Sequence, residues 1–128
     1  MQQDISDRIL DNDTNTKVNL DLEEIVLLTN KIGLEYASEK HEADRLSLLK
    51  HTVQARIMLE LDESYSNLSE AKKRRLMEAS KKYVDFIEEL LCAKKKYENL
   101  RIRYDSYKNL FEARRSMLSY KKAEMNLI

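Results

Sequence analysis

Residues 79–111 read ASKKYVDFIEELLCAKKKYENLRIRYDSYKNLF, and apolar side chains recur in this stretch at alternating steps of three and four residues. The members of this series are Ala79, Tyr83, Phe86, Leu90, Ala93, Tyr97, Leu100, Tyr104, Tyr107 and Phe111. The same register continues through Arg114, Leu118, Lys121 and Met125. Several heptads in one register predict a helix of the coiled-coil type, in which most of the aromatic seam residues belong to the core.

A second series of apolar residues at helical spacing lies upstream, between residues 18 and 62. Its members are Ile25, Leu28, Ile32, Tyr36, Ala43, Leu46, Leu49, Val53, Ile57 and Leu61. Asn19 or Asp21 is suited to cap the start of this helix, because two glutamates follow in the favoured first turn. Gly33 lies inside the series, at a cost of about 1 kcal/mol relative to alanine. It therefore indicates either a bend near residue 33 or a place where another helix comes close.

The two series and the breaks around them divide the chain into four segments. These are an acidic flexible tail (1–17), a first helix (18–62), a turn (63–68) and a second helix that is long and basic (69–126). At the turn, Asn67 followed by Glu70 has the spacing of a capping box. The sequence therefore predicts an all-α fold, with the two helices paired as a long antiparallel helical hairpin or coiled coil.

The second predicted helix carries more apolar surface than one partner helix can cover. The additional flank consists of Leu76, Met77, Val84, Ile87 and Leu91. A single hairpin would leave this flank in contact with water, so we expect the chain to assemble into a homo-oligomer.

The composition supports long helices and argues against other fold classes. The 128 residues include no proline, one glycine and one cysteine, and 36% of them are charged. So few prolines and glycines disfavour the turns of β-sheets, and one glycine cannot build a phosphate-binding loop. Cys92 lies in an apolar stretch, where we expect it to belong to the core of a protein in a reducing compartment. With no long apolar run and no signal-peptide pattern, the sequence predicts a cytoplasmic protein that does not bind a membrane.

No group of side chains in the sequence has the spacing of a catalytic or metal site. His41 and His51 lie about 280° apart around a helix axis, so they cannot meet at one metal ion. Cys92 has no histidine near it in the sequence, and the carboxylates alternate with basic residues as on a helix surface. We therefore expect a protein that is not an enzyme and uses neither a metal nor a cofactor.

Charge is distributed unevenly along the chain, although the net charge is zero. Residues 1–64 carry 7 Lys and Arg against 14 Asp and Glu, whereas residues 65–128 carry 16 against 9. Five of the later cations recur every seven residues on one flank of the seam: Lys94, Arg101, Lys108, Arg115 and Lys122. Together with neighbouring aromatic rings they are suited to bind the phosphates and bases of a single strand. Such cations also commonly pair with glutamates of a partner helix, so both uses stay open.

Further basic residues lie outside this flank. Arg114 and Lys121 occupy the seam itself. Together with Tyr107, Tyr120, Arg115 and Lys122 they are less easily explained as core residues, which indicates that the last turns leave the hairpin and meet another molecule. Arg56 lies in a locally basic stretch near the turn. It is either part of a binding surface or an ordinary surface arginine.

The order of these features resembles that of the phage recombination mediators of the UvsY type. A polar, acidic N-terminus precedes a helix that ends in Val53-Gln54-Ala55-Arg56-Ile57, and a short polar break separates it from a long helix with a basic end. Arg56 matches an arginine of that family's DNA-binding surface, whereas Gln54 stands where the family has a basic residue. The resemblance implies ring-like homo-oligomers that bind single-stranded DNA. The resemblance also implies that these homo-oligomers help a recombinase to displace a single-strand-binding protein in the host cytoplasm.

The leading hypothesis is a non-enzymatic, oligomeric single-stranded-DNA-binding protein that acts as a recombination mediator. Its candidate nucleic-acid-binding residues are Arg56, Lys94, Arg101, Lys108, Arg114, Arg115, Lys121 and Lys122. The alternative is a coiled-coil scaffold, adaptor or chaperone that binds only protein. A third hypothesis is a small inhibitor from a mobile element whose acidic tail mimics phosphates through Asp4, Asp7, Asp11 and Asp13.

Overall fold

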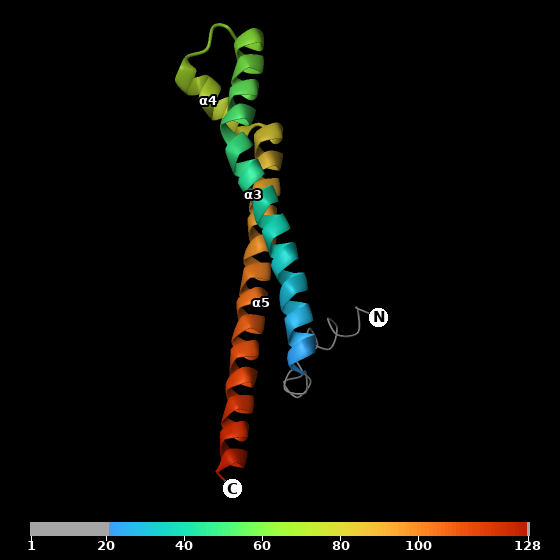
Figure 1. Cartoon of the computed structure of the whole chain (residues 1–128). Coiled ribbons are helices and arrows are strands. Elements are labelled where there is room, and N and C mark those ends of the chain that lie inside the picture. Colours follow the sequence, from blue (N-terminus) through green and yellow to red (C-terminus); the bar gives the residue numbers. More distant parts are fainter. Residues whose placement is uncertain (1–20, 128) are drawn as a thin grey trace. The chain divides into compact units, whose positions relative to one another are not determined.

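The computed structural model describes residues 21–127, and these residues form three α-helices (Figure 1). Helix α3 spans Leu22–Ser64, α4 spans Glu70–Ala79 and α5 spans Lys81–Asn126. No β-strand occurs between residues 21 and 127, which confirms the predicted all-α class. The predicted tail (1–17) lies outside the described residues.

Helix α3 begins where the sequence predicts a capping residue. A carboxylate oxygen of Asp21 accepts a hydrogen bond from the backbone N–H of Glu24 at 2.8 Å. This bond satisfies one of the donors that the start of a helix leaves unpaired. Glu23 and Glu24 lie in the first turn, where the helix dipole favours negative charge. Of the two predicted caps, Asp21 is confirmed and Asn19 lies outside the described residues.

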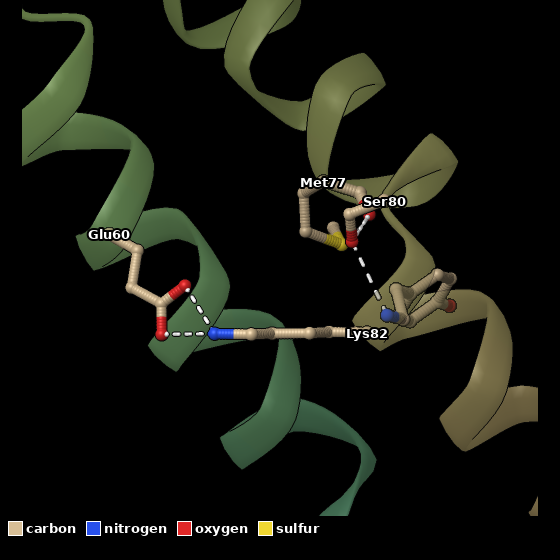
Figure 2. Close-up of polar contacts among 5 residues, drawn as sticks. Glu60, Met77, Ser80 and Lys82 are labelled. Carbon is tan, nitrogen blue, oxygen red and sulfur yellow. Dashed lines mark hydrogen bonds and ion pairs between the residues drawn. The ribbon is translucent and has the colours of Figure 1, made fainter.

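Ser80 divides the predicted second helix into α4 and α5, so the prediction of one helix over residues 69–126 is wrong in this respect. Ser80 has extended backbone angles, with φ −68° and ψ 146°. Its hydroxyl donates to the carbonyl of Met77 at 2.7 Å and accepts from the backbone N–H of Tyr83 at 3.3 Å (Figure 2). One serine therefore ends α4 and caps α5, because its short side chain competes for backbone groups that a continuous helix would use.

The start of α4 also differs from the prediction. Ser69, not Asn67, is the capping residue, since its hydroxyl accepts from the backbone N–H of Lys72 at 3.3 Å. The side chain of Asn67 instead lies 3.5 Å from the hydroxyl of Ser66. The predicted capping box placed the start too early because serine and asparagine are both strong caps, and their types alone do not decide between them.

The described chain divides into two compact units, and α3 and α5 contribute a segment to each. The first unit contains residues 21–36 and 100–127 of the described range, and the second contains Ala37–Asn99. Each unit has its own buried cluster of apolar side chains.

The core of the first unit joins the start of α3 to a later part of α5. Three side chains of α3 form this buried cluster with Tyr107 of α5: Ile25, Leu28 and Ile32. A Cβ atom at Gly33 would lie 3.0 Å from Cε2 of the Tyr104 ring, so glycine at this position permits a close approach of the two helices. Tyr107 is a correction to the sequence analysis, because only 4% of it is exposed and it belongs to the core.

The core of the second unit joins α3 to the first part of α5. Its buried cluster consists of Leu46, Phe86 and Leu90. Two ion pairs connect the same helices, one between Glu39 and Lys96 at 3.6 Å and one between Glu60 and Lys82 at 2.9 Å (Figure 2). Because the earlier residue of α3 pairs with the later residue of α5, the two segments run in opposite directions within this unit.

Helix α4 contacts the end of α3 through an ion pair between a buried lysine and an exposed aspartate. Lys73 is 7% exposed, and its Nζ lies 2.7 Å from Oδ1 of Asp62. The hydrogen bond to Asp62 raises the pKa of Lys73, and burial opposes this increase. Met77, one turn further along α4, is fully buried and so does not belong to the predicted exposed flank. The members of that flank that remain exposed are Leu76, Val84 and Leu91.

Cys92 is exposed, so its predicted place in the core is wrong. The buried Leu90 precedes it by two residues, which places the two side chains about 200° apart around the helix axis. An apolar neighbourhood in the sequence therefore does not imply a shared helix face.

Candidate nucleic-acid interface

Helix α5 continues beyond the core of the first unit. Phe111 is the last of its residues that packs against the buried cluster, whereas the helix ends at Asn126. Residues 114–127, called the C-terminal segment here, are exposed apart from the half-buried Arg114. At ~1.5 Å per residue, this segment is about 20 Å long.

Four of the predicted binding residues lie on the C-terminal segment: Arg114, Arg115, Lys121 and Lys122. None of them forms an ion pair with another residue in the range 21–127. In Arg114, the Nη2 atom is buried and has no hydrogen-bond partner in that range. Arg115 and Lys122 share one helix face, and Arg114 and Lys121 lie about 100° around the axis from them. The segment thus presents two adjacent rows of cations.

Arg101 and Lys108 differ from these four because both already contact a carboxylate. Asp105 lies between them, 3.5 Å from Arg101 and 3.3 Å from Lys108. The ammonium group of Lys108 also lies over the ring of Tyr104, 4.6 Å from its centre. Exposed pairs of this kind contribute little to stability, but they lower the local positive charge. The predicted heptad row is therefore electrostatically uneven.

Lys94 and Arg56, the two candidates in the second unit, are exposed. Neither forms an ion pair with a residue that the structure describes. Lys82 and Lys96, in contrast, bind glutamates of α3. The second unit therefore contains both arrangements that the sequence left open, unpaired cations and cations paired with the acidic helix.

The aromatic residues are mostly engaged inside the units. Tyr36 and Tyr104 stack in the first unit, with ring centres 6.2 Å apart and planes 17° apart. In the second unit, the ammonium group of Lys40 lies 5.7 Å from the centre of the half-buried Tyr97 ring. Tyr120 is 67% exposed and is the aromatic residue of the C-terminal segment. Its ring is free to stack on an unpaired base.

Helix α4 carries a basic surface that the candidate set did not include. Lys72, Arg74 and Arg75 are exposed, and no residue between 21 and 127 forms an ion pair with them. Their neighbour Lys73 is buried against Asp62 instead. The run of four basic residues, 72–75, was visible in the sequence, but only the docking of α4 separates the structural lysine from the exposed cations.

Among residues 21–127, the side chains with shifted pKa values do not lie together in one cleft. A hydrogen bond from Arg45 lowers the pKa of Glu42, and burial raises the pKa of Tyr107, with Arg103 opposing the increase. Between residues 21 and 127, no group of three or more His, Cys, Asp or Glu side chains could hold a metal ion. In the same range, no helix has the length and apolar character needed to cross a membrane.

Comparisons with protein-family models, with curated proteins and with solved structures each find no match to this chain. The function is therefore inferred from the cations and the exposed apolar side chains of the chain itself. The resemblance to the UvsY-type mediators stays a prediction from the sequence.

Proposed function

We propose that the protein binds single-stranded DNA, without catalysing a reaction, through the C-terminal segment of α5. The supporting observation is that the four cations of this segment have no ion pair within residues 21–127 and lie beside the exposed Tyr120. Cations in such an arrangement neutralise phosphates and release counterions, and an exposed ring stacks on a base. Lys94 and Arg56 are the corresponding contacts in the second unit.

The proposal includes assembly of antiparallel helical hairpins into a homo-oligomer. Exposed apolar side chains of the second unit support it, because Leu76, Val84 and Leu91 are 43%, 41% and 58% exposed. A second copy that covers them would remove apolar surface from water. An oligomer would also place several basic segments near one strand, so that weak phosphate contacts combine by avidity.

We extend the proposal to a role as a recombination mediator, which rests on the resemblance to the UvsY type. In this role the oligomer would hold single-stranded DNA while a recombinase replaces a single-strand-binding protein. The expected outcome is faster assembly of recombinase filaments on strands that are already covered by the single-strand-binding protein. No acceleration on such strands, despite DNA binding, would remove the mediator role and leave the binding activity.

Salt dependence of binding to a labelled oligonucleotide tests the proposed function. The four phosphate contacts of the C-terminal segment, each contributing ~0.7 to the slope of log K against log salt, give this segment a slope of about −3 per chain. A fourfold rise in salt would then weaken binding roughly 50-fold. Fluorescence anisotropy over a salt series measures this slope. Binding that is absent at low salt, or that does not change with salt, would contradict the proposal.

A matched pair of double variants locates the contact. Replacing Arg115 and Lys122 by glutamine removes two unpaired cations and should reduce the slope by about 1.4. The control replaces Lys82 and Lys96 by glutamine, which removes the same charge from cations that bind glutamates of α3. The control should keep the slope of the unmodified protein. Equal slopes for the two double variants would exclude the C-terminal segment as the site.

A protein-binding scaffold is the second candidate function. Exposed leucines on α3 favour it, because Leu27 and Leu34 in the first unit are 63% and 75% exposed and lie seven residues apart. Such spacing places them on one face of a helix, where a partner helix can bind. Under this function, the double change at Arg115 and Lys122 would alter oligomeric state or thermal stability, and no DNA binding would be measured.

A further inference from the structure

A groove lies between α3 and α5 in the first unit, beside the buried cluster. One part of it has a volume of about 380 Å³ and is lined by Val26 and Asn30 of α3 and by Asn109, Phe111 and Glu112 of α5. An adjoining part, of about 590 Å³, shares Asn30 and continues to Gly33 and Tyr104. Both parts are open to solvent, and each is bordered by an aromatic side chain, Phe111 in the first and Tyr104 in the second.

Gly33 allows the Tyr104 ring to pack directly against α3 along the second part of the groove. A Cβ atom at this position would lie 3.0 Å from the ring of Tyr104, so any other residue would bring its side chain against that ring. The Tyr104 ring is held by stacking on Tyr36 and by the ammonium group of Lys108 above it. An aromatic wall of fixed position therefore borders the groove.

Three polar side chains of the groove have no partner among residues 21–127, whereas the groove residue Lys108 binds Asp105. Asn30, Asn109 and Glu112 form no hydrogen bond or ion pair with other residues between 21 and 127. Thr29 differs, because its hydroxyl donates to the carbonyl of Ile25 at 2.7 Å. Two amides and one carboxylate are therefore free to bond the edge of a ligand.

The charges beside the groove fit a ligand that carries phosphates. Arg115 lies three residues after Glu112 on α5 and therefore projects from the same helix face. Lys122 continues this face two turns further along. Both cations are exposed and have no ion pair within the described residues. A strand with one base in the groove would have its phosphates beside this row.

The geometry points to the groove as a site for one unpaired nucleobase of single-stranded DNA, with preference for bases that carry an exocyclic amino group. This inference rests on the proposed function. The Phe111 and Tyr104 rings supply apolar contact for the base, and the amides of Asn30 and Asn109 bond its edge. The carboxylate of Glu112 accepts from the amino group of cytosine, adenine or guanine. Thymine has no amino group, so it leaves Glu112 unpaired near the phosphates.

The test compares labelled oligo(dC) and oligo(dT) of equal length by fluorescence anisotropy at one low salt concentration. We expect oligo(dC) to bind about tenfold more tightly than oligo(dT). In the Glu112→Gln variant this ratio falls toward one, while oligo(dT) binds more tightly because a negative charge near the phosphates is removed. The control is Glu124→Gln, an equal charge change on the C-terminal segment outside the groove. It should tighten binding of both strands and keep their ratio.

The outcomes separate this inference from the proposed function. Equal, salt-dependent binding of oligo(dC) and oligo(dT) would overturn the base site and leave the proposed function in place. Absence of salt-dependent binding to either strand would overturn both. Sedimentation of the Glu112→Gln variant adds one more outcome: a changed oligomeric state with an unchanged binding ratio would mean that the groove contacts a second copy of the chain, which overturns the base site.

Discussion

Replacing Tyr107 by phenylalanine should stabilise the protein. The Oη atom of Tyr107 is buried and has no hydrogen-bond partner among residues 21–127, and only 4% of the residue is exposed. A buried hydroxyl without a partner costs about 1–3 kcal/mol. Phenylalanine retains the ring that packs against Ile25 and its neighbours, so the expected gain in unfolding free energy is about 1 kcal/mol. For a chain of this length, that corresponds to a rise in Tm of roughly 3–5 °C.

The pH dependence of the same variant gives a second measurement. Burial raises the pKa of Tyr107 above its usual value, and Arg103 opposes the increase. Below about pH 10 the hydroxyl is neutral in the folded and unfolded states, so its ionisation does not affect stability. As the pH rises further, the unfolded state ionises first, and the unmodified protein loses stability. The stability difference in favour of Tyr107→Phe should therefore grow above about pH 10.

Urea unfolding followed by far-UV circular dichroism, at one fixed protein concentration, measures both effects. Tyr120→Phe is the control, because Tyr120 is 67% exposed and its hydroxyl reaches water in both states. It should change the unfolding free energy by less than about 0.5 kcal/mol. A loss of stability in Tyr107→Phe greater than this would refute the reasoning and would mean that the hydroxyl is hydrogen-bonded, with Arg103 as the nearest candidate donor.

Two further predictions concern the core and the helix break. Ile25→Ala should lower the unfolding free energy by about 2–5 kcal/mol, since Ile25 is fully buried, whereas Leu27→Ala, at a 63% exposed position, should change it by less than about 0.5 kcal/mol. Similar losses for these two variants in urea unfolding would contradict the assigned core. Ser80→Ala should cost about 0.5–2 kcal/mol, because it removes the hydroxyl that accepts from the backbone N–H of Tyr83. Amide hydrogen exchange should show faster exchange at Tyr83, and unchanged exchange there would argue against the cap.

The cations of α5 fall into groups that the two candidate functions use differently. Lys82 and Lys96 form ion pairs with glutamates of α3, so these two cations serve to join the helices. Arg115 and Lys122 lie beyond the residues of α5 that contact the core, and no carboxylate between residues 21 and 127 pairs with them. Pairing and DNA binding are therefore compatible in one helix, because they involve different stretches of it.

Much of the helical architecture was predictable from local rules. The steps of three and four in the two apolar series predicted the buried residues Ile25, Leu46 and Leu90, because helix periodicity determines which side chains share a face. Asp21 was predictable as a cap because its chemistry satisfies free backbone donors. The exposure of Cys92 also follows from periodicity, once its angle to Leu90 is considered.

By itself, the amino-acid sequence determined the all-α class, the main helices and the excess of basic over acidic residues in residues 65–128. These properties depend only on residue type and spacing. Only the tertiary structure decided that Tyr107 belongs to a core, that Lys73 is buried against Asp62, and that a groove lies between α3 and α5 in the first unit. The physical reason is that burial and ion pairing are properties of two surfaces in contact. Whether a lysine is free or paired depends on the carboxylate that the other helix places within reach, and no spacing along one helix contains that information.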